Sequence, residues 1–193
     1  MKKNLFILIL LSPFLLFSQN NTGEIHGNFE SNLQSYRDDP TIGATAAEED
    51  ILHNAYLNIL YTKGNFTGGL RFESYLNALM DYDPKYKGNG IPYRFATYTS
   101  DGLEVTVGNY YEQFGSGIIF RTYEDKGLGV DNAMDGVRLK YSPISGLYLK
   151  SFIGQSRTYF EYSEGIVRGV DAEFNVNEAL KIEGKTSYIL GGS

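Results

Sequence analysis

Apolar and polar residues alternate along most of the chain with a period of two, which is typical of β-strands whose two faces meet different surroundings. In the run 65–78, Phe66 and Phe72 share one face, while Arg71 and Glu73 share the other. Runs of this kind predict nine strands, at 24–35, 51–61, 65–78, 92–99, 103–111, 135–141, 147–154, 165–174 and 180–190. The pattern predicts an all-β fold.

The connections between these strands alternate in length. The long links are 36–50, 79–91, 112–134 and 155–164, and the short ones are 62–64, 100–102, 142–146 and 175–179. Bacterial outer-membrane barrels have tight turns on the periplasmic side and longer loops outside. In a soluble sandwich, nothing places a long link at every second connection. The alternation therefore favours an antiparallel up-and-down transmembrane β-barrel.

Alternation alone does not decide which face points inward. A soluble barrel directs its apolar side chains inward, whereas a membrane barrel directs them to lipid. The strands are longer than the usual five or six residues or so, the polar faces carry both charge signs, and aromatic residues recur at strand ends, where membrane girdles lie. These observations favour the membrane. The residues then expected to line a lumen are Arg71, Glu73, Glu104, Arg138, Lys150, Glu173 and Lys185, whose near-balanced signs predict weak ion selectivity.

Nine is an odd number of strands, whereas bacterial single-chain barrels have even numbers. An unpaired last strand would also leave open hydrogen-bonding groups in lipid. We therefore expect residues 20–193 to be the N-terminal portion of a larger barrel, seen here incomplete. A small barrel of eight strands is the main alternative.

The first nineteen residues predict a secretion signal, because Lys2 and Lys3 precede an apolar stretch that Pro13 interrupts. The expected location is the cell outer membrane, with its lipid as partner, and the sequence identifies no envelope protein partner.

A net charge of −6 argues against nucleic-acid binding, which needs clustered basic residues. The chain has no cysteine and therefore no disulfide framework.

Residues that could carry chemistry are few. Barrel enzymes place a histidine beside a nucleophile or carboxylates, but the only histidines, His26 and His53, fall near the starts of adjacent antiparallel strands, at opposite rims. Two acidic groups, Asp81 with Asp83 and Asp125 with Asp131 and Asp135, could offer oxygen ligands to Ca²⁺ from outer loops, yet they lack the spacing of an EF-hand. We therefore expect no enzyme activity, no metal site and no cofactor.

The longest link, 112–134, mixes apolar with charged residues. One hypothesis is that it folds into the lumen as a constriction, with Arg121 and Glu124 facing water. The other, which is simpler and favoured on the sequence, is that 116–123 extends the flanking strands as a hairpin above the membrane.

Three segments carry a family resemblance: Gly108–Gly117, Arg121–Asp125 and Asp135–Val137. They resemble a group of uncharacterised outer-membrane barrel proteins of Bacteroidota. The resemblance covers most of the mature chain, although only the block 108–137 is distinctive. It implies a larger barrel in the outer membrane and brings no activity and no functional residues.

The sequence thus predicts a non-enzymatic outer-membrane β-barrel protein, acting as a pore for transport or as a structural component of the envelope. The alternative from a different class is a secreted soluble β-sandwich that binds glycans through exposed tyrosines.

Overall fold

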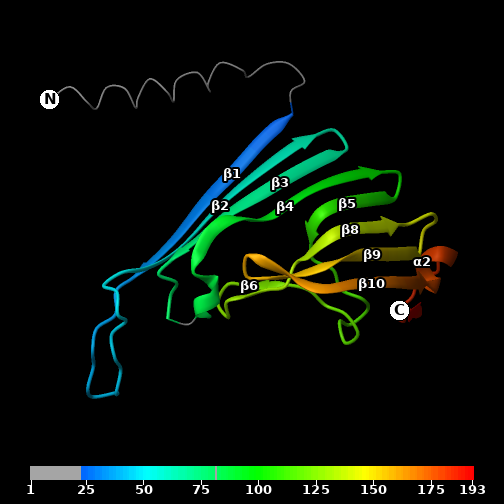
Figure 1. Cartoon of the computed structure of the whole chain (residues 1–193). Coiled ribbons are helices and arrows are strands. Elements are labelled where there is room, and N and C mark those ends of the chain that lie inside the picture. The colour runs from blue at the N-terminus through cyan, green and yellow to red at the C-terminus, as the bar shows by residue number, and fades with distance from the viewer. Residues whose placement is uncertain (1–22, 81) are drawn as a thin grey trace.

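A computed structural model describes residues 23–80 and 82–193 of the chain. Its main element is one antiparallel sheet of nine strands, in which each strand pairs with the strands before and after it (Figure 1). The strands are β1 (Glu24–Gln34), β2 (Leu52–Lys63), β3 (Phe66–Leu76), β4 (Gly88–Ser100), β5 (Leu103–Tyr110), β8 (Met134–Tyr141), β9 (Leu147–Thr158), β10 (Glu161–Asn175) and β11 (Ile189–Gly192). The expected all-β, up-and-down antiparallel sheet is confirmed. β1 and β11 are its two edges, so the sheet is not closed into a barrel.

The remaining elements are short. β6 (Glu124–Asp125) and β7 (Val130–Asp131) form a separate two-stranded hairpin, η2 (Pro84–Tyr86) is one 3₁₀ turn, and α2 (Val176–Leu180) is a five-residue helix. Among the described residues, no helix has the length and apolar character to cross a membrane. The expected signal peptide, residues 1–19, lies outside the described residues and stays a prediction.

Tight turns form at three of the four predicted short links, 62–64, 100–102 and 142–146, whereas 175–179 instead holds α2. Between β4 and β5, Asp101 and Gly102 have φ values of 44° and 77°, and between β2 and β3 Gly64 has a φ of 55°. Positive φ at both central residues gives a hairpin turn the same twist as its strands. The register then continues without slippage through β1, β2 and β3.

The prediction of a long link at 155–164 is wrong. β9 and β10 run on until only Tyr159 and Phe160 connect them. The ladder shifts register between Tyr162 and Ile166, and the backbone N–H of Ser156 donates to the Ser163 hydroxyl there. Such a bulge interrupts the period of two, which explains why the pattern did not reveal the strand.

The prediction of a final strand at 180–190 is also wrong. The Asn175 side chain accepts a hydrogen bond from the Glu178 N–H and caps α2, and Lys181 ends the helix with a φ of 53°. These local bonds compete with a strand ladder, so only Ile189–Gly192 joins the sheet. Lys185, a candidate lumen residue, therefore lies outside every strand with an exposed side chain.

A row of glycines lets the sheet curl at the end that carries the longer links. Gly108, Gly136 and Gly154 lie opposite one another in β5, β8 and β9. A Cβ on Gly136 would lie 2.1 Å from the Ile153 carbonyl oxygen, so only glycine permits this approach of the backbones. Figure 1 shows the resulting curve from β1 round to β10, and the Phe160 ring comes within reach of Gly90 in β4.

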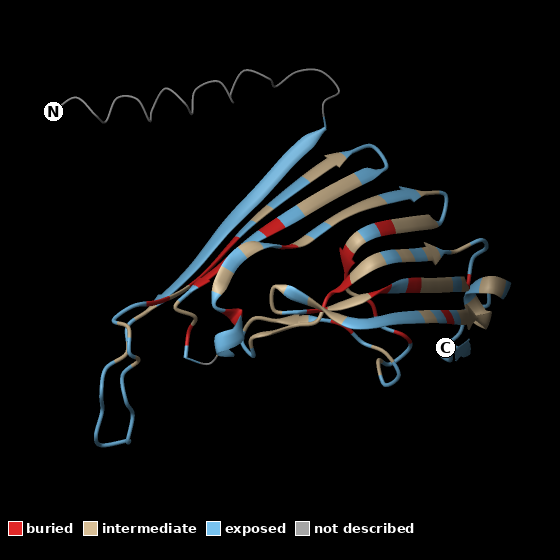
Figure 2. Cartoon of the chain, in the orientation of Figure 1, coloured by how far each residue is buried: buried red, intermediate tan, exposed pale blue. Residues whose placement is uncertain are grey.

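One face of the sheet is apolar and exposed from edge to edge. The register places on it Ile25, Phe29, Leu33, Leu57, Ile59, Phe66, Leu70, Phe72, Val107, Val137, Leu139, Ile153 and Val170, all of them exposed. The opposite face carries most of the charged residues, although Arg94, Asp135 and Arg168 lie on the apolar face. Most buried residues gather at the curled end, as Figure 2 shows.

Replacing Gly136 tests the glycine row. We expect Gly136→Ala to destabilise the fold by about 1–3 kcal/mol, because overpacking a close contact displaces backbone. Gly165→Ala in β10 is the matched control, since no atom lies within 4 Å of its added Cβ. Urea unfolding of the two variants is the measurement, and equal midpoints would contradict the role given to Gly136.

Candidate functional site

A buried ion-pair network on the polar face centres on Glu73 of β3, which has no exposed surface. Its carboxylate accepts hydrogen bonds from Arg71 Nε at 2.6 Å, from Arg157 Nη2 at 2.5 Å and from the Tyr75 hydroxyl at 3.1 Å. Burying an unpaired carboxylate costs several kcal/mol. The two guanidinium groups therefore make the burial of Glu73 possible.

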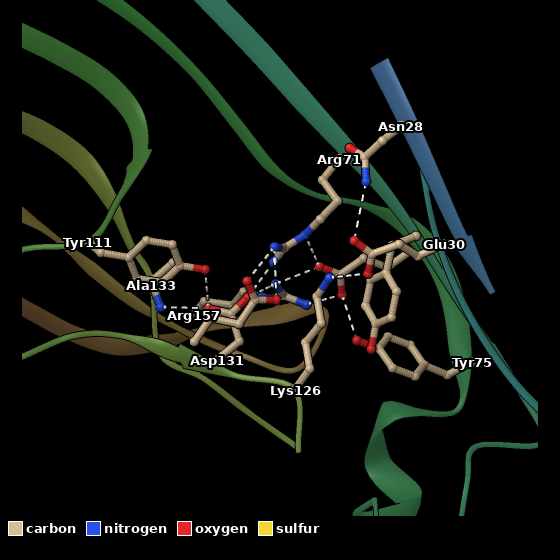
Figure 3. A network of polar contacts seen from close by, with 12 residues as sticks. Asn28, Glu30, Arg71, Tyr75, Tyr111, Lys126, Asp131, Ala133 and Arg157 are labelled. Carbon is tan, nitrogen blue, oxygen red and sulfur yellow. Dashed lines mark hydrogen bonds and ion pairs between the residues drawn. The ribbon is translucent and has the colours of Figure 1, made fainter. Parts of the chain in front are cut away.

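Asp131 of the β6–β7 hairpin joins the same two arginines (Figure 3). It accepts a hydrogen bond from Arg71 Nη2 at 2.6 Å and one from Arg157 Nη1. The Tyr111 hydroxyl and the Ala133 N–H donate to its second oxygen at 3.0 and 3.1 Å. Both carboxylate oxygens of Asp131 are thus occupied.

Glu124, at the other end of the hairpin, accepts a hydrogen bond from Arg71 Nη1 at 2.9 Å. Burial raises the pKa of the Glu124 carboxyl above its ordinary value, and the nearby Arg71 opposes this shift only in part. Arg71 therefore holds three carboxylates at once, and its guanidinium also lies 5.0 Å from the centre of the Tyr93 ring.

These contacts show that the polar face is concave. In the order of the sheet, β4, β5 and β8 separate β3 from β9. In a flat sheet the two strands would lie about 19 Å apart, given the usual strand spacing. Arg157 nevertheless bonds directly to Glu73. The sheet must therefore curl towards this face, and the hairpin fills the space inside.

Lys126 ties the hairpin to the first two strands. Its Nζ donates to Glu30 of β1 at 2.6 Å and lies 4.3 Å from the centre of the Tyr56 ring of β2. Its carbonyl oxygen accepts a hydrogen bond from the Tyr82 hydroxyl at 2.5 Å. The hairpin thus contacts β1, β2, β3 and β9.

Tyrosines pack against one another beside this network. The rings of Tyr75 and Tyr86 are 5.0 Å apart, and those of Tyr86 and Tyr159 are 4.7 Å apart. The Tyr159 hydroxyl donates to Asp83 at 2.6 Å and holds the pKa of that carboxyl below its ordinary value. This cluster joins the β3–β4 link to the β9–β10 turn at the curled end of the sheet.

A second charge network lies nearer the short turns. Arg138 Nη2 donates to Glu104 at 2.6 Å. Glu112, whose side chain is nearly buried, lies 3.4 Å from Lys140 and 3.5 Å from Lys150. With Asp171, which lies 3.9 Å from Lys150, the cluster combines three cations with three carboxylates.

The seven candidate lumen residues divide by position. Arg71 and Glu73 belong to the first network, and Glu104, Arg138 and Lys150 belong to the second. Glu173 lies on the same face of β10, opposite Tyr148, but joins neither network. Lys185 is the seventh and lies outside the sheet.

The two candidate constriction residues also separate. Glu124 points into the first network, whereas Arg121 is exposed and stacks over the Tyr123 ring at 4.9 Å. Gln113 and Arg121 form an isolated bridge, so 113–121 is a small hairpin of its own and does not prolong the β5–β8 ladder.

The sequence singled out neither Arg157 nor Glu112, and it offered Asp131 only as a possible Ca²⁺ ligand in an outer loop. Each falls in a segment that the pattern assigns to a link, so none could be placed on a strand face. The extension of β9 brings Arg157 inward, and the path of the link brings in the two carboxylates.

The histidines form no such cluster. His26 lies 3.3 Å from Glu24, and His53 lies 3.2 Å from the Ser31 hydroxyl, towards the other end of β1. Among the residues that the structure describes, no group of three metal-ligating side chains could hold a metal ion. Asp81, one of the acidic loop residues, lies outside the described residues.

Comparison with protein-family models gives a match over the whole chain. Residues 1–193 match the model of a family of unknown function (DUF6029). No curated protein matches the chain. The description of the family names no activity.

Removing the charge of Glu73 tests the first network. We expect Glu73→Gln to destabilise the fold by about 3–5 kcal/mol, because two buried guanidinium groups lose their shared carboxylate. Glu24→Gln is the control, since that side chain is exposed and its loss should change stability by less than about 0.5 kcal/mol. Urea unfolding followed by tyrosine fluorescence gives both values, and similar losses would contradict the central role of Glu73.

Proposed function

Since the chain belongs to this family of unknown function, we propose its role from the geometry of its sheet: it forms the wall of an integral outer-membrane β-barrel. The protein is non-enzymatic and acts as a pore or as a structural component of the envelope. Outer-membrane lipid is its partner, and export through a signal peptide brings it there.

The observation that carries this proposal is the exposed apolar face. Aliphatic and aromatic side chains cover most of the convex side of the sheet, apart from charged groups such as Arg168 and the Arg94–Asp135 pair, while the concave side holds two ion-pair networks. A soluble barrel or sandwich has the opposite arrangement. Apolar area left in water forfeits about 25 cal/mol per Å², and patches much larger than a few hundred Å² or so mark an interaction surface. Contact with lipid hydrocarbon would remove such a face from water.

The apolar face has limits that suit a membrane. On β5, β8 and β9, Asn109, Asp135 and Gln155 lie opposite one another on the convex side and end the apolar run. Towards the tight turns, Phe66 and Tyr98 lie opposite each other, and Tyr141 occupies the same end of β8. Aromatic girdles of this kind mark the interface between lipid and water.

The concave face suits a hydrated interior. Its charges are paired across strands, and the second network has equal numbers of cations and carboxylates. In lipid, the open edges β1 and β11 would need further strands to satisfy their backbone groups. The mechanism is therefore geometric: closure by hydrogen bonds in lipid, with weak ion selectivity inside.

Membrane extraction is the direct test. We expect the product of the complete reading frame to resist carbonate extraction and to shift in gel mobility on boiling, as closed barrels do. Release by carbonate without a shift would contradict the proposal and favour the secreted glycan-binding alternative. The apolar face would then have to be covered by a soluble partner.

A single arginine distinguishes lipid from water at the convex face. We expect Leu139→Arg to destabilise the membrane-inserted protein by about 2–4 kcal/mol, because the charge would face the hydrocarbon. Thr99→Arg on the concave face is the control and should be tolerated, since Glu104 lies opposite it. Folding into lipid vesicles, monitored by the boiling shift at increasing urea, gives the comparison. Equal midpoints would place Leu139 in water.

A further inference from the structure

We propose that residues 111–133 form a built-in plug, and that Asp131 latches the movable part of this plug across the barrel interior. The barrel would then be closed to ions at rest and would conduct once the latch is released. This inference rests on the proposed barrel function.

The path of the segment is the first argument. β5 ends at Tyr110 and β8 begins at Met134, and these two residues lie opposite each other in the ladder. A tight turn would therefore suffice to connect the strands. The chain instead passes over the concave face, where the rings of Phe114 and Phe120 lie 5.3 and 4.4 Å from that of Phe152.

The reach of the β6–β7 hairpin is the second argument. Lys126 binds Glu30 on β1, at one edge of the sheet, while Asp131 binds Arg157 on β9. Six strand spacings separate β1 from β9 along the sheet, which corresponds to about 29 Å. A hairpin that touches both crosses the hollow of the sheet at this level.

The segment is held in two different ways. Its first half is fixed by the phenylalanine cluster and by Glu112, which is buried among Lys140, Lys150 and Arg138. The hairpin is fixed mainly by charge, and its tip residue Leu128 is exposed. Polar contacts lose strength when water enters, whereas an apolar cluster does not open in this way. The hairpin is therefore the part that moves.

Asp131 is the contact that decides the position of the hairpin. It binds Arg71 from β3 and Arg157 from β9, which lie on opposite sides of the hollow. The other tethers, Glu124 and Lys126, each pair with one charged group of the wall. Loss of Asp131 removes the only described hairpin carboxylate that joins both sides.

Single-channel conductance in planar lipid bilayers tests the plug. With both proteins expressed from the complete reading frame, we expect Asp131→Asn to give a several-fold higher mean conductance than the unchanged protein, because the neutral amide holds the two arginines less strongly. Lys126→Met, which removes a partly exposed tether and leaves the buried charges intact, should raise conductance in the same direction. The control is Asp125→Asn: its carboxylate accepts from the Leu128 N–H within the hairpin, and no described wall residue is its partner.

The outcomes separate the two proposals. Gel mobility before and after boiling first shows which variants form closed barrels. If the barrels insert and all four proteins conduct equally, the plug is contradicted while the barrel stands. If none inserts and none resists carbonate, the barrel itself is contradicted. Should Asp131→Asn fail to fold, Lys126→Met against Asp125→Asn still decides the plug.

Discussion

The curled end of the sheet depends on the pairing of two buried arginines with two buried carboxylates. Glu73 and Asp131 can leave water only because Arg71 and Arg157 accompany them, and each arginine contacts both carboxylates. Without these ion pairs, nothing in the network would hold β3 and β9, which are four strand spacings apart in the sheet, close to each other. The glycine row in β5, β8 and β9 permits the curve, and the charges hold it.

This arrangement reverses the usual relation between burial and polarity. The most buried side chains include Glu73, Asn54, Asn109 and Thr106, while many large apolar side chains of the sheet are exposed. Hydrophobic burial alone therefore does not account for this fold in water. A surrounding apolar phase would resolve the contradiction, because the exposed face then becomes the favoured one.

In the proposed barrel, the two halves of segment 111–133 combine a fixed part with a movable part. Aromatic packing on Phe152 gives one half a fixed position. Ion pairs hold the other half, the β6–β7 hairpin, in a specific position, because each charge requires a particular partner. These pairs are strong only while water is excluded from them. The same chemistry that curls the wall thus also holds the hairpin.

The sequence by itself determined the strands with uninterrupted alternation, their order, their tight turns and the face on which Arg71, Glu73, Glu104 and Arg138 lie. These features follow from local rules: a period of two and the need for positive φ in hairpin turns. Where local bonds compete, as at the Asn175 cap of α2 or at the bulge in β10, the pattern gave the wrong element.

Only the tertiary structure decided that the polar face is concave and which charges meet there. Arg157 and Glu73 are far apart in the sequence, and Asp131 lies in a link with no periodicity. Contacts between such residues depend on how the whole sheet bends. Curvature is a property of all the strands together, so no local pattern encodes it.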